Sequence, residues 1–252
     1  MLSLPLASQP PAPPPPPVST ASRLLWTPWT AAKRAVLRRR LGRAVFEKIR
    51  GRYFVVWPGV FNPVVFRTGR FLAEFIATSP LLEPAGEGAT ALDVGTGCGV
   101  LGIFAALRGY QVAAVDVVPE AVSCARANAI LNRVAVELHQ GDLFAPVAGR
   151  AFDVVLFSLP KFRGTPTTTF EQSWRSPDVI DRLAAELPAM LKPGGKAYFV
   201  LTSHGDCAGM LNGLAQAGLS VERVLWRHFG VETLAVYRAS APNRPSNAAV
   251  SN

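Results

Sequence analysis

The chain has 252 residues, of which 49% are hydrophobic and 17% charged. This size and composition fit one folded domain with a sizeable core and exclude a highly charged disordered chain. The net charge of +9 belongs to one end, because residues 1–52 hold ten of the 26 basic residues and one of the 17 acidic residues. The rest of the chain is therefore neutral.

The cysteines and histidines predict neither a disulfide framework nor a metal site. Cys98, Cys124 and Cys207 form no close CxxC pair, which favours a reducing, cytoplasmic setting. No apolar run reaches the about 18–20 residues that span a bilayer, so we expect no transmembrane segment. The first residues lack the order of a secretory signal, although the Arg-rich residues 1–52 leave an organelle transit peptide as an alternative.

The N-terminal region is predicted to consist of a tail and an arm. Residues 1–22 are rich in Pro, Ser and Ala, and their proline run favours polyproline II, which predicts a disordered tail. Within residues 30–49 apolar side chains recur every four residues, at Leu37, Leu41, Val45 and Ile49. Residues 23–52 are therefore predicted to form a basic amphipathic helical arm. Such an arm fits an acidic partner (RNA, an acidic protein surface or an anionic membrane) or a solvated face.

Residues 53–90 are predicted to form a hairpin and helix element that covers the active site. Tyr53–Trp57 reads as a strand that ends at a Pro-Gly turn, and residues 66–76 read as a helix. A linker then leads to residue 90. Residues 240–252 are predicted to be a second disordered tail.

Residues 91–239 alternate between strand and helix patterns. The predicted strands are 91–95, 111–117, 134–140, 152–158, 196–202, 220–227 and 231–238, and the predicted helices are 100–109, 119–132, 177–191 and 205–217. Repeated strand–helix units imply a parallel sheet with helices on both faces. The last two strands are joined by a few residues and must lie antiparallel. The prediction is an α/β fold with a seven-stranded Rossmann-like sheet and a C-terminal antiparallel hairpin.

A glycine-rich turn follows the first strand of this domain. It reads Asp93-Val94-Gly95-Thr96-Gly97-Cys98-Gly99. Glycines at alternate positions let the backbone turn sharply and let a ligand come close. The following helix directs its N-terminal amides toward the same place. The carboxylate of Asp93 suits a cationic amino group.

Acidic residues also end the next two strands. Asp116, followed by Val117, is placed to bind both hydroxyls of a ribose. Asp142 is placed for an adenine amino group, with Leu143 packing on the ring. Gly97 to Gly102 also match GxGxxG, so a nicotinamide-dependent enzyme is the competing interpretation. Against that alternative, a carboxylate directly before the glycines would repel a pyrophosphate.

Four segments together resemble the successive motifs of class I S-adenosylmethionine-dependent methyltransferases: LDVGTGCGVLGIFAA, VDVVPEAVSCARANAILN, GDLFAPVAGRAFDVVLFSLP and LKPGGKAYFV. They are most similar to the small-domain branch that includes the glutamine-N5 methyltransferases of release factors and ribosomal proteins. The resemblance covers residues 52–238 and implies S-adenosylmethionine as cofactor. The contacts that it implies are from Asp93, Gly95, Thr96, Gly97, Gly99, Asp116, Val117, Asp142 and Leu143.

One motif of that branch is replaced. After the fourth strand the branch carries Asn-Pro-Pro-Tyr, whose Asn and adjoining carbonyl hold the planar nitrogen that is methylated. This chain has Ser158-Leu159-Pro160-Lys161 there, and a Ser hydroxyl is shorter than an Asn amide. We expect Ser158, Pro160 and Lys161 to position the acceptor. The expected function is methyl transfer to the oxygen, nitrogen or carbon of a small molecule. The alternatives are a protein-glutamine or RNA N-methyltransferase with a divergent motif and a non-catalytic S-adenosylmethionine-binding scaffold.

Further substrate contacts are expected around the loop 161–176, which begins at the carboxyl end of a strand. Its Arg and Trp residues suit an anionic or aromatic group. The expected substrate residues are Phe61, Asn62, Thr68, Phe162, Arg163, Trp174 and Arg175. His204, after the strand 196–202, is the histidine expected to serve as a base, and a loop histidine is the alternative.

Overall fold

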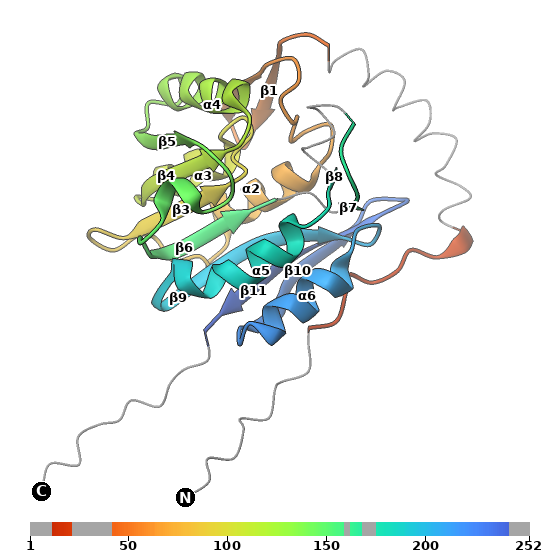
Figure 1. Cartoon of the computed structure of the whole chain (residues 1–252). Coiled ribbons are helices and arrows are strands. Elements are labelled where there is room, and N and C mark those ends of the chain that lie inside the picture. The colour runs from red at the N-terminus through yellow and green to blue at the C-terminus, as the bar shows by residue number, and fades with distance from the viewer. Residues whose placement is uncertain (1–11, 22–41, 159–161, 168–174, 242–252) are drawn as a thin grey trace, which may run out of the picture.

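The structure, a computed structural model, describes residues 12–21, 42–158, 162–167 and 175–241. Its centre is a seven-stranded sheet in the order β10-β11-β9-β6-β3-β4-β5 (Figure 1). The strands are β3 (Thr90–Val94), β4 (Gln111–Asp116), β5 (Val136–Gln140), β6 (Phe152–Phe157), β9 (Leu191–Thr202), β10 (Ser220–His228) and β11 (Thr233–Ser240). The predicted seven-stranded α/β fold is confirmed.

The sheet is parallel in its centre and antiparallel at one edge. Strands β5, β4, β3, β6 and β9 pair in parallel. Strand β11 then pairs antiparallel with both β9 and β10. The predicted C-terminal hairpin is therefore confirmed, and its second strand is the one that joins the parallel sheet.

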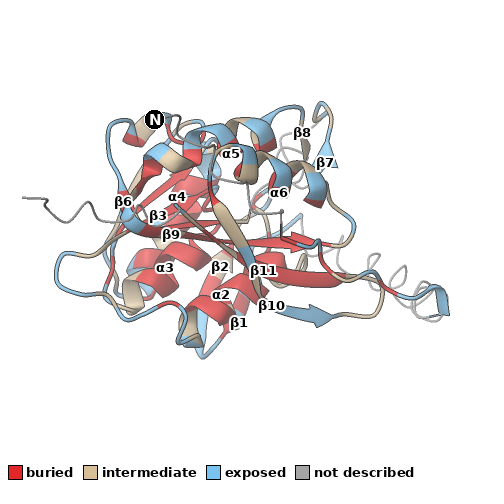
Figure 2. Cartoon of the chain, turned by 90° about the horizontal axis from the view of Figure 1, so that it is seen from below, coloured by how far each residue is buried: buried red, intermediate tan, exposed pale blue. Residues whose placement is uncertain are grey.

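Helices cover both faces of the sheet, as predicted (Figure 2). They are α2 (Thr68–Thr78), α3 (Val100–Leu107), α4 (Pro119–Leu131), α5 (Val179–Met190) and α6 (Cys207–Gln216). Side chains alternate along β6, so that Val154 and Leu156 join the core of α2, α3 and α4, while Val155 and Phe157 join the core of α5 and α6. Burial of each such side chain contributes about 2 kcal/mol, which anchors the strand ends that carry the site.

The predicted helix over residues 30–49 is wrong at its C-terminal end. Residues 45–49 form strand β1 (Val45–Ile49), which pairs with β2 (Arg52–Val56). Arg50 and Gly51 both have positive φ, 48° and 82°, as a two-residue hairpin turn requires. Burial alternates along β1, a period of two that the four-residue spacing of apolar residues concealed. Residues 22–41, most of the predicted arm, lie outside the described residues.

The hairpin is fastened to α4 by two buried asparagines. The side chain of Asn128 donates to the carbonyl oxygens of Val55 at 2.7 Å and Cys98 at 2.8 Å, and it accepts a bond from the Val55 N–H at 2.7 Å. Asn132 donates to the carbonyl oxygen of Tyr53 at 2.9 Å. The hairpin is thus joined to the glycine-rich turn through α4.

Part of the proline-rich segment packs on the body, contrary to the predicted disorder of residues 1–22. Ala12 and Val18 are buried. The Tyr237 hydroxyl donates to the carbonyl oxygen of Pro13 at 2.8 Å, and Arg223 donates to that of Pro14 at 2.7 Å. Polyproline II leaves its carbonyls without internal hydrogen bonds, so they can accept from a neighbouring strand. Residues 1–11 and 242–252 lie outside the described residues.

Two short strands lie within the loop 161–176, around which substrate contacts were predicted. They are β7 (Phe162–Arg163) and β8 (Arg175–Ser176), which pair in parallel. Among the described residues, no helix is long and apolar enough to cross a bilayer. The predicted cytoplasmic setting stays a prediction.

Candidate functional site

A cavity of about 370 Å³ lies where β3, β4, β5 and β6 end. Because the carboxyl ends of parallel strands meet at one sheet edge, residues distant in the sequence share its wall. The predicted site residues that line it are Phe61, Gly95, Thr96, Gly97, Asp116, Val117, Asp142, Leu143, Ser158 and Arg175. The volume is within the range of small-molecule and cofactor sites.

The glycine-rich turn needs glycine for two different reasons. Gly97 has a φ of 55° but open space around it, since an added Cβ would come no closer than 3.9 Å to the Phe61 oxygen. Gly99 has a φ of 86°, and an added Cβ would lie 3.1 Å from that of Ala125. Gly99 thus permits helix packing, whereas Gly97 leaves backbone open to the cavity. The N–H of Gly95 donates to the Val115 oxygen at 2.9 Å and fixes the turn to β4.

Asp93 is fully buried and does not line the cavity. One carboxylate oxygen accepts hydrogen bonds from the Thr96 hydroxyl at 2.7 Å and the Gly102 N–H at 2.8 Å. Within the described residues, the other oxygen, Oδ1, has no hydrogen-bond partner. Burial raises the pKa of Asp93 to about 6. Asp93 therefore shapes the turn from inside the fold, and its contact with a cationic amino group stays a prediction.

Asp116 lines the cavity with both carboxylate oxygens already placed by the backbone. Oδ2 accepts from the Gly97 N–H at 2.8 Å and Oδ1 from the Val118 N–H at 3.0 Å. Each oxygen keeps a further lone pair that can accept from a ligand hydroxyl. Burial raises the pKa of Asp116. Val117, which follows it, is 51% exposed and presents an apolar surface to the cavity.

The segment after β5 supplies a strained backbone and a charged side chain. Leu143 is buried and has a φ of 46°, the left-handed region in which a non-glycine residue costs about 1 kcal/mol or more. Asp142 pairs with Arg182 of α5 at 2.6 Å. Arg182 also pairs with Asp178, four residues before it, whereas Asp142 is 40 residues away in the sequence. No local sequence pattern could therefore have predicted the pair with Asp142. Arg182 also lines the cavity and was not predicted.

The part of the cavity where the sequence predicted the acceptor, called the acceptor side below, is formed by Ser158 and the residues around β8. Arg175, Ser176 and Asp178 line it together with Pro166. Arg175 donates to the carbonyl oxygen of Arg163 at 3.3 Å. Three residues predicted for this side lie outside the described residues. They are Pro160, Lys161 and Trp174.

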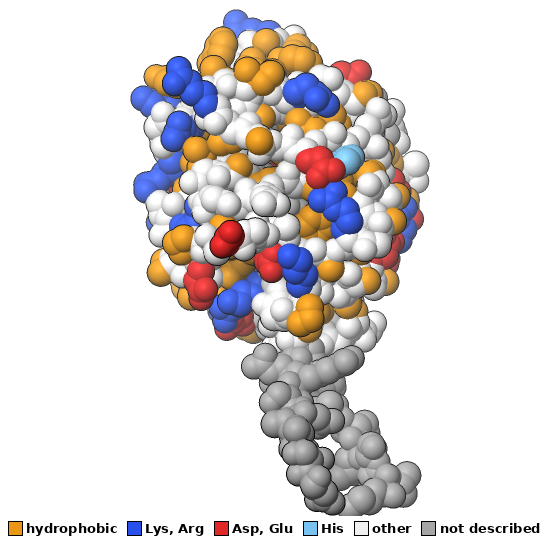
Figure 3. All heavy atoms as spheres, turned by 90° about the vertical axis from the view of Figure 1, so that its left-hand side faces the viewer, with side chains coloured by type: hydrophobic (Ala, Val, Ile, Leu, Met, Phe, Trp, Pro, Cys, Tyr) orange, Lys and Arg blue, Asp and Glu red, His pale blue; other side chains and the backbone are white. Residues whose placement is uncertain are grey.

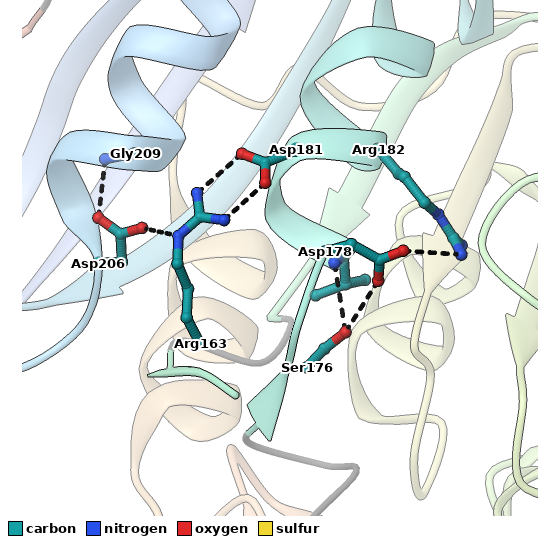
Figure 4. Close-up of polar contacts among 8 residues, drawn as sticks. Arg163, Ser176, Asp178, Asp181, Arg182, Asp206 and Gly209 are labelled. Atoms are coloured by element: carbon teal, nitrogen blue, oxygen red, sulfur yellow. Dashed lines mark hydrogen bonds and ion pairs between the residues drawn. The ribbon is translucent and has the colours of Figure 1, made fainter. Parts of the chain in front are cut away.

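Arg163 does not line the cavity, although it was predicted to bind substrate. Its guanidinium forms a two-pronged ion pair with Asp181 at 2.6 and 2.7 Å, and its Nε lies 2.5 Å from Asp206 (Figure 4). Asp206 in turn accepts from the Gly209 N–H and caps α6. The hydrogen bonds from Arg163 lower the pKa of both carboxyls. We name Arg163, Asp181 and Asp206 the Arg163 clasp, because they join β7 to α5 and α6.

Of three further predicted residues, one lines the cavity and two are buried behind it. Phe61 lines the cavity and stacks on Phe66, with ring centroids 4.5 Å apart. Asn62 is buried, donates to Glu47 at 2.9 Å and accepts from two backbone N–H groups of its own loop. Thr68 is buried at the start of α2.

Two further predicted residues stand away from the cavity wall. Phe162 is 38% exposed, and His204 is exposed after β9; neither lines the cavity. These positions give no support to a catalytic base at His204, which stays a prediction.

A family model for the methyltransferase small domain matches residues 53–224. The chain belongs to this family. The predicted class, an S-adenosylmethionine-dependent methyltransferase, is confirmed at the level of family and fold, and the nicotinamide alternative receives no support. The match begins within β2 and ends within β10, so it covers the central parallel strands, whereas β1 and β11 lie outside it.

Curated relatives of this methyltransferase domain are named for macromolecular substrates. A ribosomal RNA small subunit methyltransferase C from Chromohalobacter salexigens is 38% identical over 57% of this chain and 40% of its own length. A release factor glutamine methyltransferase from Deinococcus radiodurans is 36% identical over 41% of this chain and 42% of its own length. This chain therefore spans about two fifths of these relatives.

The fold of the methyltransferase domain is also found among solved structures. A T. thermophilus 16S rRNA methyltransferase in complex with AdoMet and guanosine superposes with a TM-score of 0.60. It is 18% identical, and the alignment covers 79% of this chain and 50% of that chain. At that identity the likeness concerns the fold.

The methyltransferase site fits its cofactor in three respects that the structure displays. The cavity has the volume of a cofactor site, and Gly97 leaves open space beside its backbone. Asp116 offers two oriented oxygens for a diol. Among the described residues, one buried carboxylate oxygen of Asp93, directly behind the glycine-rich turn, has no partner, which suits a positive charge on that side of the cavity.

Proposed function

We propose that this chain transfers the methyl group of S-adenosylmethionine to a nitrogen of an RNA base. The observation that carries the proposal is that one cavity is lined by the glycine-rich turn, Asp116 and Leu143 on one side and by Ser158 on the other. A methyl donor and its acceptor must share such a space, because most of the rate of an in-line displacement comes from holding both partners in line.

The proposed cofactor contacts follow from the placed groups. Asp116 accepts hydrogen bonds from the ribose hydroxyls, and the backbone at Gly95 and Gly97 lies against the amino acid part. Val117 and Leu143 pack on the adenine ring, beside the Asp142–Arg182 ion pair. The bound cofactor supplies a methyl group made electrophilic by its sulfonium. The chain orients that group and keeps water from it.

Ser158 is the proposed acceptor-positioning residue, because it follows β6 and lines the cavity. Its hydroxyl can donate one hydrogen bond and accept others, so it can hold an amino group or a ring nitrogen. Arg175, at the cavity, suits a phosphate that flanks a base. No carboxylate at the cavity is without a backbone or arginine partner, among the described residues that line it, so we assign no proton acceptor.

An RNA acceptor replaces the small molecule that the altered motif led us to expect. The relatives are named for ribosomal RNA, a ribosomal protein and release factors. They give the small-molecule expectation no support. RNA is preferred here because the positive side chain of Arg175 lines the cavity among the residues around β8, where Ser158 also lies.

A protein glutamine is the second candidate acceptor. The release factor glutamine methyltransferase at 36% identity favours it. A glutamine amide also presents a planar nitrogen, so the cavity chemistry alone does not separate the two acceptors.

The test has a binding arm and a transfer arm, both with the full chain. Calorimetry with S-adenosylmethionine, S-adenosylhomocysteine and NAD should show micromolar binding of the first two and none of NAD. Methyl-labelled cofactor is then incubated with total RNA and, separately, with RNA-free protein extract. Label in RNA supports the proposal, and label in protein alone replaces it by the glutamine candidate. Cofactor binding without label in either sample favours the non-catalytic S-adenosylmethionine-binding scaffold, and absence of cofactor binding contradicts all three interpretations.

A further inference from the structure

The outward face of the β1–β2 hairpin carries exposed aromatic rings among basic side chains. Phe46 is 70% exposed and Tyr53 is 53% exposed. Lys48 and Tyr53 are direct cross-strand partners, and the Lys48 ammonium lies 5.1 Å from the Tyr53 ring centroid. Large apolar side chains this exposed on a small two-stranded element mark an interaction surface more often than a solvated one.

The exposed charge on the hairpin and directly before it is of one sign. Arg43, Lys48, Arg50 and Arg52 are exposed. The acidic residue of the hairpin, Glu47, points inward, is buried and accepts a hydrogen bond from Asn62. Cations without an exposed acid on the same hairpin produce a positive potential that attracts a polyanion.

The end of α4 extends the surface. Asn132 binds the carbonyl oxygen of Tyr53, so its neighbours Leu131 and Arg133 lie beside the hairpin, and both are exposed. Figure 3 shows basic side chains gathered next to hydrophobic ones on the upper part of the face, the end of the molecule where α4 and β1 lie. We name Arg43, Phe46, Lys48, Arg50, Arg52, Tyr53, Leu131 and Arg133 the hairpin face.

The hairpin face is fixed to α4, and the chain that follows the hairpin reaches the cavity. The bonds of Asn128 and Asn132 fix β2 to α4, which reduces the entropy that a partner would otherwise have to order. Val60 and Phe61, a few residues beyond β2, line the cavity. A strand of RNA bound at the hairpin is therefore held next to the segment that directly follows β2 and forms part of the cavity wall.

We propose that the hairpin face binds single-stranded RNA, with bases stacked on Phe46 and Tyr53 and phosphates held by the surrounding lysine and arginines. Stacking on aromatic rings combined with a positive track is how proteins bind single strands without reading sequence. The proposal rests on the proposed function, in which RNA carries the accepting nitrogen. It assigns the hairpin the task of holding RNA beside the cavity.

The test measures fluorescence anisotropy of a labelled single-stranded RNA of about 12 nucleotides, a length within known single-strand sites. Wild-type chain should bind with an affinity that falls as salt rises. The variant Lys48→Ala/Arg50→Ala/Arg52→Ala should bind about tenfold more weakly, with a salt slope smaller by about 2 because three phosphate contacts are lost. The variant Phe46→Ala/Tyr53→Ala should bind about tenfold more weakly with an unchanged slope.

The matched control is Trp226→Ala/Arg227→Ala, which removes an exposed aromatic and an exposed arginine from β10. It should bind RNA as the wild type does. All variants should bind S-adenosylhomocysteine with wild-type affinity, which shows that they are folded and separates this proposal from the proposed function. Hairpin variants that bind RNA normally, an equal loss in the control, or binding to vesicles with anionic lipid in place of RNA would overturn the assignment.

Discussion

The two sides of the cavity are stabilised by different interactions. On the cofactor side, backbone hydrogen bonds hold the residues in place. The N–H of Gly95 donates to the Val115 carbonyl, and Asp116 accepts from two backbone N–H groups. On the acceptor side, exposed ion pairs hold the segments in place, above all the pairs that Arg163 forms with Asp181 and Asp206. Exposed pairs contribute about 1 kcal/mol or less and weaken with salt. The cofactor side is therefore rigid, whereas the acceptor side is adaptable.

The largest expected effect is on the rigid side. Replacing Asp116 by Ala removes the proposed ribose contact and the acceptor of the Gly97 N–H. Binding of S-adenosylhomocysteine should weaken by at least about tenfold, or ~1.4 kcal/mol, in a calorimetric titration. Asp153→Ala is the control, because Asp153 binds Thr90 and Lys192 and does not line the cavity. Equal affinity of the two variants would show that Asp116 has no part in the cofactor site.

The second prediction concerns the adaptable side and uses variants of the Arg163 clasp. Arg163→Ala should leave cofactor affinity unchanged and lower methyl transfer about tenfold, because β7 loses its attachment to α5 and α6 and the acceptor is held less well. Arg163→Lys should give an intermediate rate, since lysine lacks the two-pronged geometry.

Arg150→Ala serves as the control for the clasp. It breaks a similarly exposed ion pair with Glu137, away from the cavity. If the Arg150 and Arg163 variants transfer methyl groups equally fast, the clasp does not position the acceptor.

Asp93, behind the rigid side, should make the free energy of unfolding of the chain depend on pH. Its folded pKa of about 6 exceeds the ordinary 3.8, so the folded chain binds the proton more tightly. The resulting stabilisation is complete below the lower value and is lost as pH rises through about 6. Between pH 7.5 and pH 5 this group should add about 1 kcal/mol to the free energy of unfolding.

Denaturant unfolding of Asp93→Asn at both pH values measures this contribution. The amide oxygen can still accept from Thr96 and Gly102. The variant should lack the gain on acidification that the wild type shows, and an identical gain in both chains would contradict the assignment.

The smallest expected effect concerns the N-terminal contact with the sheet edge. Tyr237→Phe removes the hydroxyl that donates to Pro13 and should lower the free energy of unfolding by about 1 kcal/mol or less. Cofactor affinity should not change, because Tyr237 does not line the cavity. Accelerated proteolysis within residues 18–21 of the variant, directly after the proline run, would support the contact, and an unchanged cleavage rate would contradict it.

Local patterns were sufficient for most of the sheet and for the cofactor side. The apolar run of β6 marks a strand buried on both faces, and Pro119 marks the first turn of α4. The positions of Gly97, Asp116 and Asp142 after successive strands placed them at one sheet edge, and all three line the cavity. These predictions succeeded because backbone conformation and strand direction depend on residues close in the sequence.

Periodicity alone was ambiguous at the hairpin. Val45 and Ile49 are four residues apart, which fits one face of a helix and also one face of a strand. The left-handed pair at Arg50 and Gly51 closes a hairpin in the structure. Only the packing of Ile49 and Phe54 against the body distinguishes the two patterns, because their burial stabilises the strand.

The sequence by itself determined the fold class, the methyltransferase motifs and the position of Gly97, Asp116 and Asp142 at the cavity. Tertiary structure decided where β11 inserts, which partners Arg163 takes and that residues 12–18 lie against Arg223 and Tyr237. The physical reason is sequence separation. Turn geometry and periodicity act over a few residues, whereas Arg163 meets carboxylates 18 and 43 residues away and Tyr237 meets a carbonyl 224 residues away. Contacts at such separation arise only when the whole chain has packed.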